Sequence, residues 1–134
     1  MVELLRNAHF LVTVDRTTKI VRVTRSAEPF DSIEQIQQEC LAVTDALAMV
    51  DRSAMSLFLD IRAAPGRNDP RFEEATLRLR TAAVRGFGRV AVLVRTVAGA
   101  LQVQRHSRED GVDRMITDSE EELLAYLTAA PRRR

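Results

Sequence analysis

Hydrophobic and polar residues alternate along two short stretches near the start of the chain, residues 10–14 and 20–24. Alternation with a period of two is typical of a strand with one buried and one solvated face. The polar residues 15–19 join the two stretches. The pattern therefore predicts an antiparallel β-hairpin.

Two later stretches, residues 57–61 and 90–94, are apolar at nearly every position. A strand of this kind has both faces covered, as in the interior of a parallel sheet. Residues 114–117 predict one more short strand.

Between these strands, apolar residues recur at the three- and four-residue spacing of amphipathic helices. The first predicted helix covers apolar positions from 33 to 50, and we expect Asp31 to cap it with Glu34 completing a capping box. The second should begin at the cap Asp69 and end before Gly86.

Two further helices are predicted, over about residues 96–107 and after a cap at Asp118 or Ser119. The resulting order is ββαβαβαβα, an α/β fold with about four helices. Short crossovers predict a mixed, mostly parallel five-stranded sheet with an antiparallel hairpin strand at one edge. At 134 residues we expect a single domain over residues 9–128, with residues 1–8 and 129–134 as tails.

Composition narrows the function classes. The net charge is +1, so no overall field selects nucleic acid or an acidic membrane. Cys40 is the only cysteine, which excludes an internal disulfide or a multi-cysteine metal site. No apolar run approaches the ~18 residues of a membrane span. No signal peptide is visible at the start of the chain, so the sequence predicts a cytoplasmic protein.

The usual catalytic and cofactor motifs do not occur. The glycines form no phosphate-binding loop, and there is no G-x-S-x-G. His9 and His106 are the only histidines; His106 lies near Glu109 and Asp110, a weak candidate for a metal site beside the commoner reading as exposed polar residues. We therefore expect no catalytic residue, no metal and no cofactor.

The strongest polar candidate is the pair Asp60 and Arg62, at the end of the first inner strand. Both alternate to the same face, and the following loop, residues 63–69, lies at the strand's carboxyl end, where open α/β sheets place functional groups. The pair is either a contact for an anion or partner, or a structural feature, namely an ion pair or a cap for the next loop. Because a buried unpaired carboxylate costs several kcal/mol, we expect Asp60 to face a site, paired or hydrated.

The outer side of the second helix carries Arg71, Arg78 and Arg85, with Leu77 and Val84 on its flank. One interpretation is a solvated face with a Glu74–Arg78 ion pair. The other is a partner surface, in which arginines lie beside partly exposed apolar side chains.

Taken together, these features resemble the STAS superfamily, in particular its SpoIIAA-like, anti-sigma-factor-antagonist-type domains. The resemblance covers most of the chain from residue 9 to 127. It rests on the hairpin, the strand LFLDIR with the helix that follows, the strand RVAVLVR, and the final short strand with the helix EEELLAYL.

The resemblance implies a non-enzymatic regulatory domain that docks a partner protein through the loop and helix after the central strand. The partner-binding residues would be drawn from that segment: Asp60, Arg62, Arg67, Asp69, Arg71, Arg78 and Arg85. Antagonist members are switched by phosphorylation at the start of this helix. Residues 60–74 contain no Ser or Thr, and Asp69 supplies a permanent negative charge there. The hypothesis is therefore a domain held in a phospho-like electrostatic state.

Three functions compete: a protein-interaction module, a carrier or sensor of a small apolar ligand, and, least favoured, an enzyme using Asp60 and Arg62. A flat surface with exposed Leu77 and Val84 would favour the first. A pocket of a few hundred cubic ångströms between sheet and helices would favour the second, which some SpoIIAA-like relatives suggest. A homodimer through an exposed hairpin strand, residues 10–14 or 20–24, is a further expectation.

Overall fold

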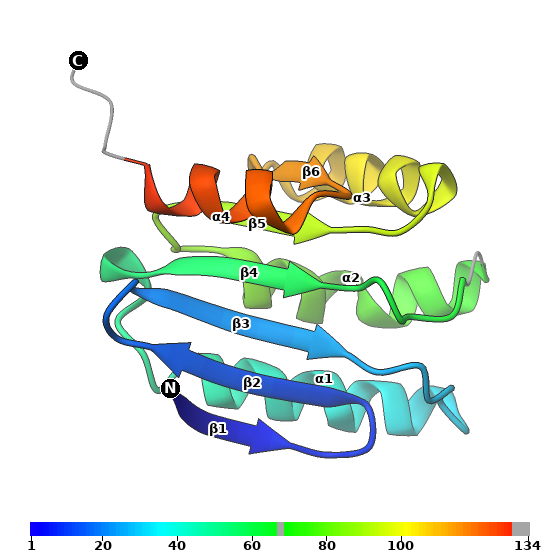
Figure 1. Cartoon of the computed structure of the whole chain (residues 1–134). Helices are drawn as coiled ribbons and strands as arrows, with labels where there is room; N and C mark the ends of the chain where they lie inside the picture. Colours follow the sequence, from blue (N-terminus) through cyan, green and yellow to red (C-terminus); the bar gives the residue numbers. More distant parts are fainter. Residues whose placement is uncertain (67–68, 130–134) are drawn as a thin grey trace.

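The computed structural model describes residues 1–66 and 69–129. These residues form one six-stranded sheet and four α-helices, which confirms the α/β class (Figure 1). The strands are β1 (Val2–Arg6), β2 (Phe10–Asp15), β3 (Ile20–Arg25), β4 (Ser56–Asp60), β5 (Val90–Leu93) and β6 (Met115–Thr117). The helices are α1 (Ile33–Leu47), α2 (Pro70–Val84), α3 (Val97–Asp110) and α4 (Glu120–Thr128), with a short 3-10 turn at Arg52–Ala54.

The strands lie in the sheet in the order in which they occur along the chain. The pairs β1–β2 and β2–β3 are antiparallel, and β3 to β6 run parallel. Each right-handed crossover adds its strand on the same side of the previous one, so the three crossover helices fall on one face. Figure 1 shows α1, α2 and α3 behind the sheet and α4 in front of it.

The sixth strand corrects the expected count of five. Residues 1–8 were predicted as a tail, yet β1 pairs with β2, with Glu3 opposite Thr13 and Leu5 opposite Val12. A bulge between Glu3 and Leu5 shifts the register. Leu4 and Leu5 can therefore both pack against the core, and the bulge hides the alternation that would have indicated a strand.

Strand β1 also changes which strands form the edges of the sheet. The hairpin strands β2 and β3 are both interior, and the exposed edges of the sheet are β1 and β6. The expectation that residues 10–14 or 20–24 form an open edge is therefore wrong. Self-association through either of these two strands is therefore not supported, and self-association itself stays a prediction from sequence.

Helix starts follow side-chain caps. α1 begins after Ser32 rather than after the expected Asp31: Ser32 Oγ accepts a hydrogen bond from the Gln35 backbone N–H at 3.1 Å. The Asp31 backbone N–H in turn donates a hydrogen bond to Gln35 Oε1, so the reciprocal pair lies one residue later than predicted. Asp69 caps α2 as expected, and Gly86 follows that helix with a φ of +89°.

The core is split by the sheet into two sides. On β4, Leu57 faces α1 and α2, whereas Phe58 faces α4 beside Leu123 and Leu127. Alternation along each strand thus assigns neighbouring residues to different layers. Among the described residues, no helix is long and apolar enough to cross a membrane.

Candidate functional site

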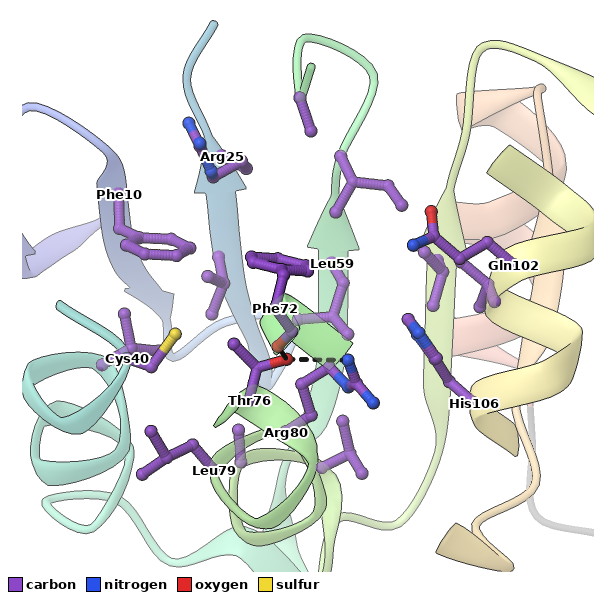
Figure 2. A pocket seen from close by; sticks show the side chains of 18 of the residues that line it. Phe10, Arg25, Cys40, Leu59, Phe72, Thr76, Leu79, Arg80, Gln102 and His106 are labelled. Carbon is purple, nitrogen blue, oxygen red and sulfur yellow. Dashed lines mark hydrogen bonds between the residues drawn. The ribbon is translucent and has the colours of Figure 1, made fainter. Parts of the chain in front are cut away.

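A largely apolar cavity of about 300 Å³ lies between the sheet and helices α1, α2 and α3 (Figure 2). Its floor is a row of side chains on three adjacent parallel strands: Val23 lies beside Leu59, and Leu59 beside Val92. Leu59 remains partly accessible although its chain neighbours Phe58 and Asp60, which face the other side, are buried. An accessible leucine at the centre of a sheet marks an opening in the helical layer.

The cavity does not lie at a reversal of strand order. In doubly wound sheets, the reversal of strand order opens a crevice at the carboxyl ends of the strands, and ligands bind there. From β3 to β6 this sheet grows in one direction only. The cavity of this protein lies instead beneath the three crossover helices, with small residues such as Ala64 and Ala83 in its wall.

Four polar side chains meet at the α2–α3 side of the cavity around the carboxylate of Glu73. This carboxylate accepts hydrogen bonds from Arg80 Nη1 at 2.8 Å, Gln102 Nε2 at 2.8 Å and His106 Nε2 at 3.1 Å. Arg105 adds an ion pair at 3.2 Å. Helices α2 and α3 are thereby joined through one acidic residue.

Electrostatics fix the protonation state of this cluster. Burial raises the pKa of Glu73, but the hydrogen bond from Gln102 and the charges of Arg80 and His106 outweigh it and lower that pKa overall. The pKa of His106 is lowered, chiefly by burial and by the nearby Arg80. At neutral pH Glu73 is ionised and His106 is a neutral ring that donates its Nε2 proton to Glu73.

Arg80 is only partly used by this cluster. Its Nη1 donates to both Glu73 Oε2 and Thr76 Oγ1, each at 2.8 Å. Its Nε and Nη2 are buried and have no hydrogen-bond partner among the described residues. Figure 2 shows the guanidinium reaching from α2 into the space between Thr76 and His106.

The opposite end of the cavity is aromatic. Arg25 is almost fully buried, and its guanidinium lies 4.4 Å from the ring centre of Phe30 and 5.7 Å from that of Phe10. Cys40 lies between this end and α2, and burial raises the pKa of its thiol to about 11. The thiol is therefore protonated and unreactive at neutral pH.

The predicted pair Asp60 and Arg62 forms as expected, but on the other face of the sheet. Arg62 Nη2 lies 2.9 Å and Arg62 Nε 3.1 Å from the Asp60 carboxylate, and Arg22 Nη2 adds a third contact at 2.8 Å. Glu120 from α4 lies 3.2 Å from Arg22. Asp60 is buried, only 4% exposed. The pair is a structural network that joins β3, β4 and α4, and it lies apart from the cavity.

The ionisation of Asp60 should make the free energy of unfolding depend on pH. Burial raises the pKa of its carboxyl, but hydrogen bonds from Arg62 and Arg22 outweigh this and hold the pKa below its usual value. A carboxyl with a depressed folded-state pKa contributes stability above its unfolded pKa, and loses it as pH falls through the folded value. Asp60→Asn should therefore cost about 2 kcal/mol at pH 7, and the gap to wild type should close below about pH 4.

Urea unfolding of both proteins at several pH values between neutral and acid measures this gap. Glu73 titrates in both proteins, so its contribution cancels in the difference. A gap that stays constant down to the acid end would show that the ionised Asp60 contributes nothing.

The remaining predicted residues lie mainly on the outer side of α2. Arg71, Arg78 and Arg85 are exposed, and Asp69 is the helix cap. Arg67 lies outside the described residues. Among those that are described, Glu74 and Arg78 form no ion pair; the pair on this helix is Glu73–Arg80.

The flank of α2 differs from expectation in one respect. Leu77 is 41% exposed, but Val84 is buried in the core against the sheet. The apolar contact area that a partner would find beside the arginines is therefore smaller than predicted.

The cavity cluster was missed at the sequence level. Thr76 and Arg80, four residues apart, interrupt the inner side of α2 with polar groups, which was the available signal. Their partners Gln102 and His106 are on another helix, and no short-range pattern links them to α2.

Comparisons with protein-family models, with curated proteins and with solved structures find no match for this chain. The resemblance to the STAS superfamily therefore stays a prediction from sequence, and function has to be argued from the site itself.

Proposed function

We propose that this protein binds a small, largely apolar molecule in the cavity between its sheet and helices α1, α2 and α3. The observation that carries the proposal is the cavity itself: about 300 Å³, apolar for most of its wall, with a few polar groups gathered at one side. This size and lining are typical of small-molecule sites in proteins. A carrier or sensor role needs only binding of this kind.

The unfilled space also costs stability, because side chains around an apolar void lose contacts that a filled core would make. A ligand that fills it would restore those contacts. This is a physical reason to retain a cavity at a position where one larger side chain would close it.

The partner-docking hypothesis has one observation in its favour, the exposed row Arg71, Arg78 and Arg85 with Leu77 beside it. The burial of Val84 weighs against it. We rank it second, and its test is whether a charge-reversed variant of these arginines loses a partner that the wild type retains.

Filling the cavity should abolish binding of a neutral apolar probe. Ala83 lines the cavity from α2, and Ala83→Leu adds a branched side chain to that space with only a small loss of helix propensity. We expect 1-octanol to shift the amide resonances of cavity residues in the wild type, and to bind at least tenfold more weakly to Ala83→Leu. The measurement is a two-dimensional NMR titration of the labelled protein.

Ala82→Leu is the matched control, because Ala82 is the neighbouring residue on the same helix and is exposed. It should bind 1-octanol as the wild type does. If the wild type gives no saturable shifts, or if Ala83→Leu binds as well as Ala82→Leu, the cavity is not a binding site.

A further inference from the structure

The buried guanidinium of Arg25 is the polar group at the aromatic end of the cavity. Arg25 is only 9% exposed, and its side chain lines the cavity. It lies two residues after Val23 on β3, so the two side chains share the face of the sheet that forms the cavity floor. Figure 2 shows Arg25 beside Phe10, on the side of the cavity away from His106. A positive charge is therefore held next to a largely apolar space.

This charge has no acidic partner in the described part of the chain. Arg114, whose side chain is buried to a similar degree, is bonded to the carboxylate of Asp110. Arg25 forms no such ion pair: Glu28 and Glu39 act on it only at longer range, and burial lowers its pKa. A guanidinium stays protonated at neutral pH even so. The rings of Phe10 and Phe30 offset only part of the cost of burying it.

One edge of the Arg25 guanidinium has donors that the protein does not use. Nη1 donates to the Ser26 backbone carbonyl. Nε and Nη2 have no acceptor among residues 1–66 and 69–129, yet neither is sealed off as the same two atoms of Arg80 are. This edge keeps accessible surface at a residue that lines the cavity, so a molecule bound there can reach it.

The free edge also defines the acceptor that suits it. The Nε–H and one Nη2–H of a guanidinium point the same way, at a spacing that matches the two oxygens of a carboxylate. An alcohol offers one oxygen and no charge. Glu28 and Glu39 contribute negative potential here, so a ligand with a single negative charge is favoured over a dianion such as phosphate.

The head group would lie where the cavity meets solvent. Arg25 ends β3, and the lining at this end also comes from the loops after β3 and β4. Pro29 and Pro65, one from each loop, line the cavity and are exposed. A carboxylate held at this mouth keeps part of its contact with water, which reduces the cost of desolvating it.

The volume limits the rest of the ligand. A space of about 300 Å³ holds roughly ten water molecules at liquid density, and octanoate has about ten non-hydrogen atoms. Its chain would run inward from Arg25 along the floor, over Leu59 toward Val92, which is the neighbour of Leu59 on β5.

We propose that the cavity binds medium-chain monocarboxylates with the carboxylate on the Nε and Nη2 edge of Arg25, at the mouth, and the hydrocarbon chain inward over Leu59. This inference rests on the proposed function, since it names the chemical class of the ligand for the same cavity. It adds a requirement for a carboxylate that apolar binding alone would not impose.

The test compares octanoate with 1-octanol, which share a chain length and differ in the head group. In the wild type at neutral pH, octanoate should bind roughly tenfold more tightly or better, because charge-assisted bidentate bonds add to the contacts of the chain. NMR titration gives both dissociation constants. Arg25→Met keeps the length of the side chain but removes the charge and the fork. It should reduce the octanoate advantage below about threefold, while 1-octanol binds as before.

Two controls locate the head group. Arg78→Met removes one positive charge from the exposed side of α2, and should leave the octanoate advantage unchanged. The Nε–H resonance of Arg25, assigned through its own side-chain carbons, should shift in the wild type with octanoate and not with 1-octanol. This second readout needs no variant, so it decides the position of the carboxylate even if Arg25→Met does not fold.

The outcomes separate the two proposals. If 1-octanol binds as tightly as octanoate or more tightly, the carboxylate inference is overturned and the apolar site stands. If neither probe binds, both proposals fail. If octanoate is preferred but the preference survives in Arg25→Met, or the Arg25 Nε–H resonance does not respond, the carboxylate lies elsewhere and the assignment of Arg25 is overturned.

Discussion

Replacing Asp110 with asparagine should lower the free energy of unfolding by about 3–5 kcal/mol, one of the two largest effects that we expect in this protein. Asp110 ends α3, and Arg114 leads into β6. Arg114 Nη2 lies 2.6 Å from Asp110 Oδ2, and the two side chains are only 4% and 2% exposed. Asparagine keeps an oxygen for the Val112 backbone N–H, so the substitution mainly leaves the buried guanidinium without its counter-charge.

A double variant tests this cause. Asp110→Leu combined with Arg114→Met removes both charges and replaces them with apolar side chains, which is often close to neutral for buried pairs. It should be more stable than Asp110→Asn. Chemical unfolding monitored by circular dichroism gives the three free energies. A loss under about 1 kcal/mol in the single variant would mean that water reaches Arg114 and that the pair is not desolvated.

Phe58→Ala should cost a similar 3–5 kcal/mol, because it empties a packed site on the α4 side of the sheet. Phe58 is 1% exposed and packs with Leu93 and Leu123. The guanidinium of Arg22 lies 4.3 Å from its ring centre, so the variant also loses a cation–π contact.

Phe72→Ala provides the matched comparison, since it removes the same side chain from the wall of the cavity. Phe72 is only partly buried and already borders empty space, so fewer contacts are lost. We expect it to cost less than half as much as Phe58→Ala. Equal losses from the two variants, measured by thermal and chemical unfolding, would contradict the difference in packing between the two sides of the sheet.

Local patterns predicted most of the fold. The hairpin and the inner strands are evident from alternation and from continuous apolar runs, and the start of α2 from Asp69 and Pro70. β1 was missed because a bulge places Leu4 and Leu5 on the core together, which breaks the period of two. Asp31 and Ser32 are both good helix caps, so the sequence alone does not decide between them. In the structure Ser32 is the cap, paired with Gln35.

The polar clusters were also predicted only in part, and local contacts again decided which ones. Asp60 and Arg62 were found because residues two apart on a strand share a face, and their contact is local. The cluster around Glu73 depends on Gln102 and His106, which are 29 and 33 residues away along the chain. No periodicity in one sequence reports which helices lie side by side, so neither this cluster nor the cavity could be predicted in position.

The order of the strands has a consequence for how the protein is made. Every strand pairing joins strands that follow one another along the chain. As the polypeptide emerges during synthesis, β1, β2 and β3 can form a three-stranded meander before any later segment exists, and each new helix and strand then adds to a finished edge. Contacts between residues that are near each other along the chain favour rapid folding. β6 and α4 are the last elements to emerge, so the packing around Phe58 is completed only when α4 is available.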